Sequence, residues 1–284
     1  MAYKPSPRPN FDGPTHIPAR SVTHHLWGDE VSGRVPDWCY VSTDKIHQLV
    51  LGLGPGQAFR HSPDYKTRFA ADEVYYVLTG EMALANPETG EVRMAKAGEW
   101  VFFRRDTWHH GFNVGTEALR VLEVLAPPPS TGSCGTYALD KPDLEQRLYG
   151  QDELLGNLAL DRPEHPQTMR VLREQDLVWR LEGERQQLAV GIVASTEQLT
   201  VGRCRVLPGT ETDLWSHGGD VSLYHMSGLL HVRVPDNDGE RSFQLEPGDG
   251  FFAPEGTEYF FYNVGDEAAE FMLAVAPDYL PGQP

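Results

Sequence analysis

Three features are scarce in this chain of 284 residues: cysteine, long apolar runs and positive charge. The cysteines Cys39, Cys134 and Cys204 lie far apart, so the sequence has neither a disulfide framework nor a CxxC metal motif. No apolar run approaches the roughly 18 residues that a membrane-spanning helix needs. The first residues do not resemble a signal peptide. These absences predict a cytoplasmic protein.

The charge balance narrows the class of partner. The 41 acidic residues outnumber the 24 basic residues, which gives a formal net charge of −17. Such an excess repels nucleic-acid phosphates and anionic lipids. We therefore expect a small-molecule partner, and no binding to nucleic acid or to a membrane.

The chain contains two copies of one unit, over roughly 41–128 and 194–278. The offset between the copies falls from 153 to 148 before the YYVLTG segment, so the first copy has five extra residues there. Three matched pairs carry the repeat: STD at 42–44 with STE at 195–197, YYVLTG at 75–80 with LYHMSG at 223–228, and FNVG at 112–115 with YNVG at 262–265.

Each copy has the pattern of short β-strands separated by turns. The segments VYYVLTGEMALA and LYHMSGLLHVRV alternate in polarity and are rich in β-branched and aromatic residues. Polar turns at 86–91 and 235–240 are placed to close hairpins. Between the copies, residues 142–159 have helical spacing. The pattern predicts two β-barrels or sandwiches joined by a partly helical connector.

The spacing of the first copy resembles that of the bicupins, which are two-domain cupins. Glu73 and Gly80 match the family's Glu-x6-Gly, and Gly98, His109 and Asn113 match the second family motif. The resemblance implies an all-β chain of two jelly-roll barrels in tandem. The predicted segments are an N-terminal arm (1–40), barrel 1 with the metal site (41–128), a connector (129–193) and barrel 2 (194–284).

The resemblance also implies a metal site in barrel 1, held by Glu73 and His109. The family's His-x-His is missing, because its positions fall on Thr67 and Phe69, or on Lys66 and Arg68. His61 is the candidate replacement if the five extra residues loop out between it and Glu73.

The three proposed ligands, His61, Glu73 and His109, would form a two-His-one-carboxylate set. Non-haem Fe(II) oxygenases use such a set and leave positions open for substrate and dioxygen. Fe(II) is preferred on this basis, although Mn, Ni and Zn also suit these ligands.

Five further residues are candidates for the wall or mouth of the pocket. Tyr75, Phe103 and Trp108 would suit an aromatic or apolar substrate, and plain barrel core is their alternative role. Arg104 could bind a substrate carboxylate or be a solvated surface charge. His110 follows His109, and since neighbours on a strand face opposite ways, it is expected to point outward or to support the ligands.

Barrel 2 has lost the ligand pattern, with Val221 at the Glu position and Tyr259 at the His position, so His217 remains alone. We expect this half to be free of metal.

The resulting hypothesis is a dioxygenase-like cupin acting on a small organic substrate, aromatic or enolised, and working as a homodimer. Two alternatives stay open: a metal-dependent lyase, isomerase or decarboxylase, and a non-catalytic small-molecule-binding cupin. No catalytic side chain beyond the metal ligands is identified.

Overall fold

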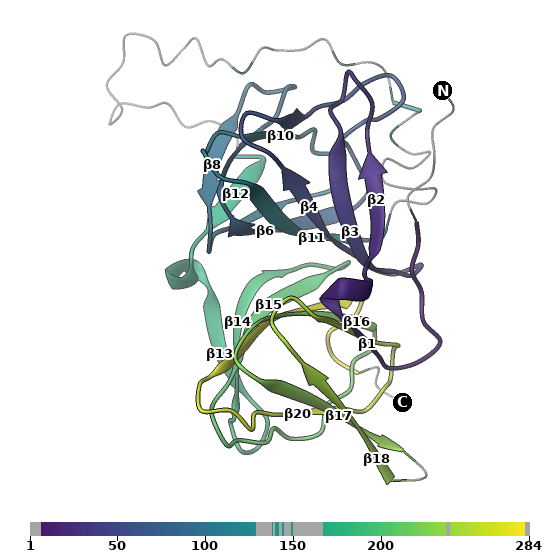
Figure 1. The fold of residues 1–284 in the computed structure, drawn as a ribbon, viewed down its shortest axis with the longest axis vertical. Helices are drawn as coiled ribbons and strands as arrows, with labels where there is room; N and C mark the ends of the chain where they lie inside the picture. Colours follow the sequence, from purple (N-terminus) through teal and green to yellow (C-terminus); the bar gives the residue numbers. More distant parts are fainter. Residues whose placement is uncertain are drawn as a thin grey trace.

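The computed structural model describes residues 7–128, 167–236 and 239–281, together with residues 138, 140, 141, 144 and 149. These residues fold mainly into antiparallel strands arranged as two lobes (Figure 1). Each lobe has one seven-stranded and one smaller sheet, so the predicted all-β fold of two tandem barrels is confirmed. Within the described residues, no helix is long and apolar enough to cross a membrane.

The first barrel has a seven-stranded sheet of order β12-β9-β6-β11-β4-β3-β2 and a four-stranded sheet of order β5-β10-β7-β8. The strands of the larger sheet are β2 (Thr23–Trp27), β3 (Val35–Ser42), β4 (His47–Leu53), β6 (Asp72–Thr79), β9 (Trp100–Phe103), β11 (Leu119–Ala126) and β12 (Met169–Leu172). Those of the smaller sheet are β5 (Ala58–Phe59), β7 (Glu81–Ala85), β8 (Val92–Lys96) and β10 (His110–Asn113).

The second barrel repeats this arrangement with sheets of order β1-β19-β16-β21-β15-β14-β13 and β18-β17-β20. The larger sheet contains β1 (Thr15–Ile17), β13 (Val178–Glu182), β14 (Leu188–Ser195), β15 (Thr200–Val206), β16 (Asp220–Ser227), β19 (Gly250–Ala253) and β21 (Ala269–Ala276). The smaller one contains β17 (Leu230–Asp236), β18 (Gly239–Leu245) and β20 (Phe260–Tyr262). Two short 3-10 turns, η1 (Ala19–Ser21) and η4 (Glu174–Asp176), precede β2 and β13.

The strand positions confirm the internal repeat. β4 and β15 begin 153 residues apart, β6 and β16 begin 148 apart, and β11 and β21 begin 150 apart. β3 and β14 also match, so the repeat extends upstream of residue 41. β2 and most of β3 consequently lie within the residues assigned from sequence to an N-terminal arm. The four segment boundaries stay a proposal.

The two barrels exchange a strand with each other. β1 precedes the first barrel in the chain but pairs with β19 of the second. β12 precedes the second barrel but pairs with β9 of the first. Most of the predicted helical stretch, 142–159, lies outside the described residues, whereas 169–182 of the connector forms β12, η4 and β13.

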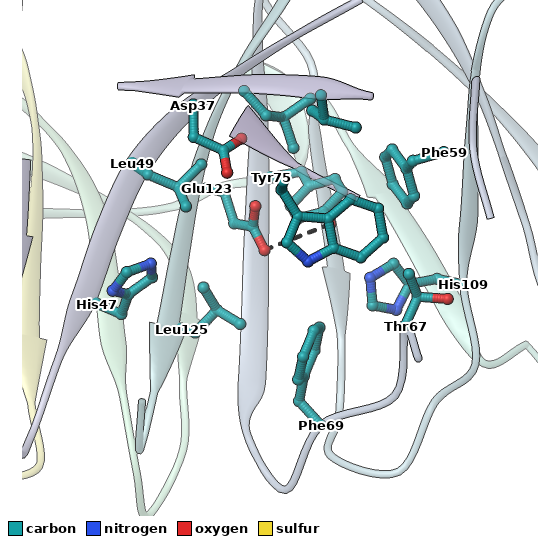
Figure 2. Close-up of a pocket in the computed structure, with 13 residues that line it drawn as sticks. Asp37, His47, Leu49, Phe59, Thr67, Phe69, Tyr75, His109, Glu123 and Leu125 are labelled. Atoms are coloured by element: carbon teal, nitrogen blue, oxygen red, sulfur yellow. Dashed lines mark hydrogen bonds between the residues drawn. The ribbon is translucent and has the colours of Figure 1, made fainter. Parts of the chain in front are cut away.

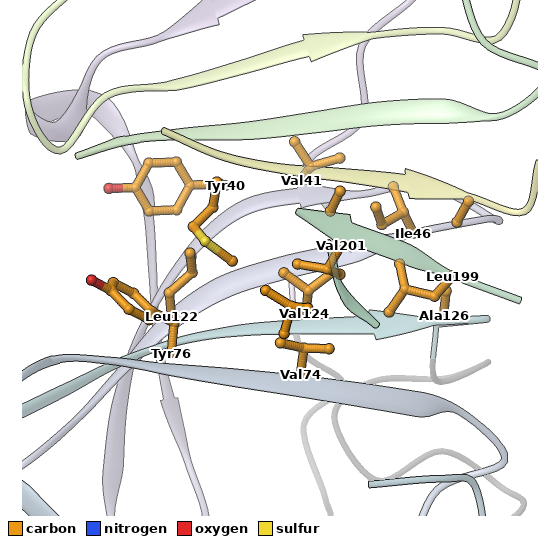
Figure 3. Packing of buried hydrophobic residues seen from close by; sticks show 14 of the residues in the cluster. Tyr40, Val41, Ile46, Val74, Tyr76, Leu122, Val124, Ala126, Leu199 and Val201 are labelled. Atoms are coloured by element: carbon orange, nitrogen blue, oxygen red, sulfur yellow. The ribbon is translucent and has the colours of Figure 1, made fainter. Parts of the chain in front are cut away.

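A shared apolar core joins the barrels (Figure 3). Val74, Leu122 and Val124 project from the first barrel and pack with Val201 of the second in one cluster of buried side chains. The Trp100 indole N–H contacts Met272 Sδ across the interface, at 3.3 Å from nitrogen to sulfur. Outward positions of the first sheet are therefore apolar because they face the other barrel and not solvent.

The opposite face of the same strands lines the interior of barrel 1. Tyr75 on β6 is the cross-strand partner of Glu123 on β11, and Glu123 is the partner of Leu49 on β4. Because successive side chains on a strand alternate between faces, Glu73 and Leu125 also point inward. This register places polar groups within an otherwise apolar barrel.

Candidate functional site

A cavity of about 50 Å³ lies inside the first barrel, bordered by β3, β4, β6 and β11 and by the segment that leads into β6 (Figure 2). It has room for a few water-sized groups or a very small organic molecule. Thirteen side chains line it: Trp27, Val35, Asp37, His47, Leu49, Leu51, Phe59, Thr67, Phe69, Tyr75, His109, Glu123 and Leu125.

His109 stands in the wall of this cavity, directly before β10. Its Nδ1 lies 3.2 Å from the carbonyl oxygen of Thr107, which accepts the ring proton and leaves the lone pair on Nε2. Burial lowers the pKa of His109 to about 4, so the imidazole is neutral at pH 7. A neutral ring with a free Nε2 lone pair can accept a proton or bind a metal.

Glu73 lies beside that lone pair at the start of β6. Its Oε2 is 3.8 Å from His109 Nε2 and makes no hydrogen bond within the described residues. Burial, and the nearby Glu123 and Asp72 carboxyls, hold the pKa of Glu73 well above its ordinary value. The structure therefore brings Glu73 and His109 together as the sequence predicts.

Thr67 and Phe69 occupy the neighbourhood in which the family motif would place its two histidines. The His109 amide donates to the Thr67 carbonyl at 3.1 Å, and the Asp106 amide donates to the Phe69 carbonyl at 2.8 Å. The segment 67–69 thus runs along the His109 segment, and both side chains line the cavity. Neither phenyl nor an alcohol is an ordinary ligand for iron, so two expected ligand positions lack ligand chemistry.

His61 packs against His110. The Nδ1 of His61 lies 2.6 Å from His110 Nε2, and the His61 amide donates to the same nitrogen at 3.2 Å. Because a backbone N–H can only donate, His110 Nε2 is an acceptor and its proton resides on Nδ1, next to the Tyr149 hydroxyl. His61 Nδ1 then carries a proton, and its lone pair is on Nε2.

Within the described residues, no group of three His, Cys, Asp or Glu side chains is placed to hold a metal ion. Glu73 and His109 lie beside each other, and the roles of His61, Glu73 and His109 as metal ligands stay a prediction.

The other predicted residues divide between cavity, core and surface. Tyr75 lines the cavity, and its hydroxyl is 3.5 Å from Glu123 Oε1. Phe103 packs on His109, with ring centroids 4.7 Å apart. Trp108 is buried beside His61 and under the Arg68 guanidinium. Arg104 lies outside the cavity wall, where it pairs with Asp72 at 2.9 Å and with Glu197 of the second barrel.

Sequence reasoning missed three buried polar residues of the cavity: Asp37, His47 and Glu123. Burial raises the pKa of Glu123 to about 8, and burial together with Glu123 raises the pKa of Asp37 well above its ordinary value. Burial lowers the pKa of His47 to about 4. The available signal was a charged residue at an inward position of an apolar strand, as in LRVLEVLA at 119–126.

The second barrel is built differently inside. His217 Nδ1 donates to the Tyr279 carbonyl at 2.5 Å, and its ring packs on Tyr259 and Tyr279. Val221 and Tyr259 are buried in an apolar cluster at the positions of Glu73 and His109. His217 consequently sits among aromatic rings.

Comparison with known proteins agrees with this architecture. A cupin domain model matches residues 61–125, the stretch that contains His61, Glu73 and His109. No curated protein sequence matches the chain significantly.

Three solved structures match nearly the whole chain. A proposed glyoxylate-induced protein from Pseudomonas aeruginosa is 15% identical, with 97% of this chain and 94% of that one covered and a TM-score of 0.66. The formate complex of oxalate decarboxylase from Lactobacillus farciminis is 16% identical, with coverages of 97% and 89% and a TM-score of 0.61. Oxalate decarboxylase from Bacillus subtilis, with Mn(II) centres, is 18% identical, with coverages of 96% and 79% and a TM-score of 0.62.

Identities of this size indicate a shared fold and leave the substrate open. Residues 61–125 therefore match a cupin domain model, and the chain as a whole shares the tandem two-barrel fold of these solved structures.

Proposed function

We propose that this protein binds a small organic molecule inside its first barrel. The observation that carries the proposal is the cavity with unsatisfied polar atoms in its wall. Both ring nitrogens of His47 and the hydroxyl of Thr67 lack a hydrogen-bond partner within the described residues, although both side chains are buried. Leaving such groups unpaired costs free energy, which a ligand or water in the cavity would recover.

The size of the cavity restricts the ligand. A volume of about 50 Å³ suits a molecule of a few non-hydrogen atoms and is small for a catechol or another ring substrate without movement of the wall. This supports a small aliphatic ligand over the aromatic substrate that the sequence suggested.

A fragment screen tests this function. The full chain, stripped with a chelator, is screened by ligand-observed NMR against amines, alcohols, carboxylates and amides of two to six non-hydrogen atoms. Thr67→Leu fills part of the cavity and is expected to abolish binding of every hit. Thr116→Leu on the exposed surface is the matched control. Hits that bind to Thr67→Leu as tightly as to the natural protein would contradict the proposed location.

The second candidate is the metal-dependent oxidoreductase of dioxygenase type that the sequence suggested. It is favoured by the approach of His109 Nε2 to Glu73 Oε2, since neutral imidazole and carboxylate suit Fe(II), Mn(II), Ni(II) or Zn(II). A bound metal would supply Lewis acidity or dioxygen activation at that pair. Among the described residues, Glu73 and His109 lie beside each other, and His61 is the proposed third ligand.

Metal content distinguishes the two candidates. Purified protein, reconstituted anaerobically with Fe(II) or Mn(II), is analysed by elemental analysis beside His61→Ala. One metal per chain, lost in the variant, would support the three-ligand oxidoreductase, and the absence of bound metal would favour the binding function. A homodimer and a cytoplasmic location are part of this proposal.

A further inference from the structure

The acidic and hydrogen-bond-accepting groups in the cavity wall restrict the class of ligand. We propose that it selects a small organic cation, such as a short alkylammonium ion. This inference rests on the proposed binding function and specifies its ligand.

Two carboxyl groups face the cavity, and no lysine or arginine is among the described side chains that line it. Asp37 on β3 and Glu123 on β11 point toward each other in Figure 2, and both are at least nine-tenths buried. Within the described residues, Asp37 has no hydrogen-bond partner, and Glu123 has the long contact with the Tyr75 hydroxyl. None of the thirteen lining side chains is lysine or arginine. A cation placed here would compensate the buried acidic groups.

The remaining polar groups of the wall supply acceptors. His47 is 3% exposed, lines the cavity, and has no hydrogen-bond partner on either ring nitrogen within the described residues. A neutral imidazole always has one lone pair that can accept an N–H. Thr67 Oγ1 has no hydrogen-bond partner in the described structure, and His109 Nε2 carries the lone pair left by the bond to Thr107. A wall rich in acceptors fits a ligand rich in N–H donors.

Aromatic rings complete the surroundings. Trp27, Phe59, Phe69 and Tyr75 contribute their side chains to the same cavity. Aromatic faces attract ammonium groups and also cover an alkyl body. A carboxylate ligand would meet Asp37 and Glu123, and none of the thirteen lining side chains is a lysine or arginine that could bind it, so this wall disfavours anions of the oxalate type.

The test compares three probes of similar size and different charge. Ethylammonium, ethanol and acetate are titrated into the chelator-treated full chain by isothermal titration calorimetry. We expect ethylammonium to bind at least tenfold more tightly than ethanol, and acetate not to bind. The ranking is measured on the natural protein and so does not depend on the folding of a variant.

Substitutions then locate the binding. Asp37→Asn keeps the shape and removes the ionisable carboxyl group, and is expected to weaken ethylammonium binding at least tenfold. Asp44→Asn makes the same change at an exposed position and should leave the affinity unaltered. Glu123→Gln is the second variant, used if Asp37→Asn does not fold as judged by its thermal transition.

The outcomes distinguish the cation preference from the proposed binding of a small organic molecule. Acetate or ethanol binding as tightly as ethylammonium in the natural protein, with Thr67→Leu abolishing it, would overturn the cation preference and leave the binding function intact. The same holds if ethylammonium binds and neither carboxyl variant weakens it. If no fragment of any charge binds, both proposals fall.

Discussion

His109 Nε2 lies 3.8 Å from Glu73 Oε2, and the carboxylate oxygen makes no hydrogen bond within the described residues. Burial keeps the His109 ring neutral and favours a proton on Glu73. The two side chains are thus close enough to bind one metal ion together, and no third His, Cys, Asp or Glu joins them among the described residues.

Metal binding at this pair is expected to be weak. Two protein ligands hold a divalent ion less firmly than three or four. Mn(II) bound after reconstitution should be removed by a chelator within one dialysis, and His109→Ala should abolish binding. His217→Ala in the second barrel is the control and should leave the metal content unchanged. A fully loaded His109→Ala protein would place the metal elsewhere.

Glu123 should make the protein less stable at pH 8 than at pH 5. Its pKa is about 8 in the folded chain and 4.5 ordinarily. The unfolded chain releases this proton first, so the free energy of unfolding falls as pH rises from 4.5 to 8, by on the order of 5 kcal/mol at most. Glu123→Gln cannot release a proton and should be more stable than the natural protein at pH 8, with the two within about 1 kcal/mol at pH 5. Urea denaturation at pH 5 and pH 8 measures the free energy of unfolding of both proteins. If Glu123→Gln and the natural protein differed by the same amount at both pH values, this prediction would be wrong.

His47 should contribute to acid sensitivity. Its pKa is lowered from 6.5 to about 4 by burial, with Arg8 and His25 adding to the effect. The unfolded chain takes up a proton below pH 6.5 before the folded chain does. The free energy of unfolding is therefore not reduced by His47 above pH 6.5, and it falls by roughly 3 kcal/mol as the pH falls from 6.5 to 4.

His47→Leu removes this titration and should flatten the stability curve between pH 6.5 and 4. The exposed His24→Leu serves as control. Equal slopes in His47→Leu and in the natural protein would show that His47 is accessible to protons in the folded state.

The core between the barrels should be sensitive to loss of volume. Met272 is 1% exposed and its sulfur receives the Trp100 indole N–H. Met272→Ala leaves a cavity and an unpaired donor, so we expect a loss of about 2–5 kcal/mol in the free energy of unfolding. Urea denaturation followed by tryptophan fluorescence measures this. A loss below about 1 kcal/mol would mean that the interface repacks.

Sequence patterns predicted the strands and the repeat because both depend on local alternation and turn residues. The matched offsets of β4 with β15 and of β6 with β16 follow directly from the aligned segments. The proximity of Glu73 and His109 was also predictable, since both residues stand at the spacings of the family motifs.

Other features depend on which strands meet, and one sequence does not show that. The inward carboxyl of Asp37 on β3 can be interpreted only once β4 is known to lie between β3 and β11, which puts Asp37 and Glu123 on the same face of one sheet. The position of His61 depends on the path of a loop, and the loop brings it to His110. β1 pairs with β19 of the second barrel, and β12 pairs with β9 of the first. Each pairing joins segments far apart in sequence, which local sequence patterns do not reveal.

The exchange of β1 and β12 has a consequence for the covalent chain. A cut anywhere between residues 129 and 166 would leave two pieces, each carrying a strand that completes the other's larger sheet. The pieces would also share the apolar cluster around Val74, Leu122 and Val201. Such a nicked protein should stay assembled, and the two halves expressed together should recognise one another as a complementing pair.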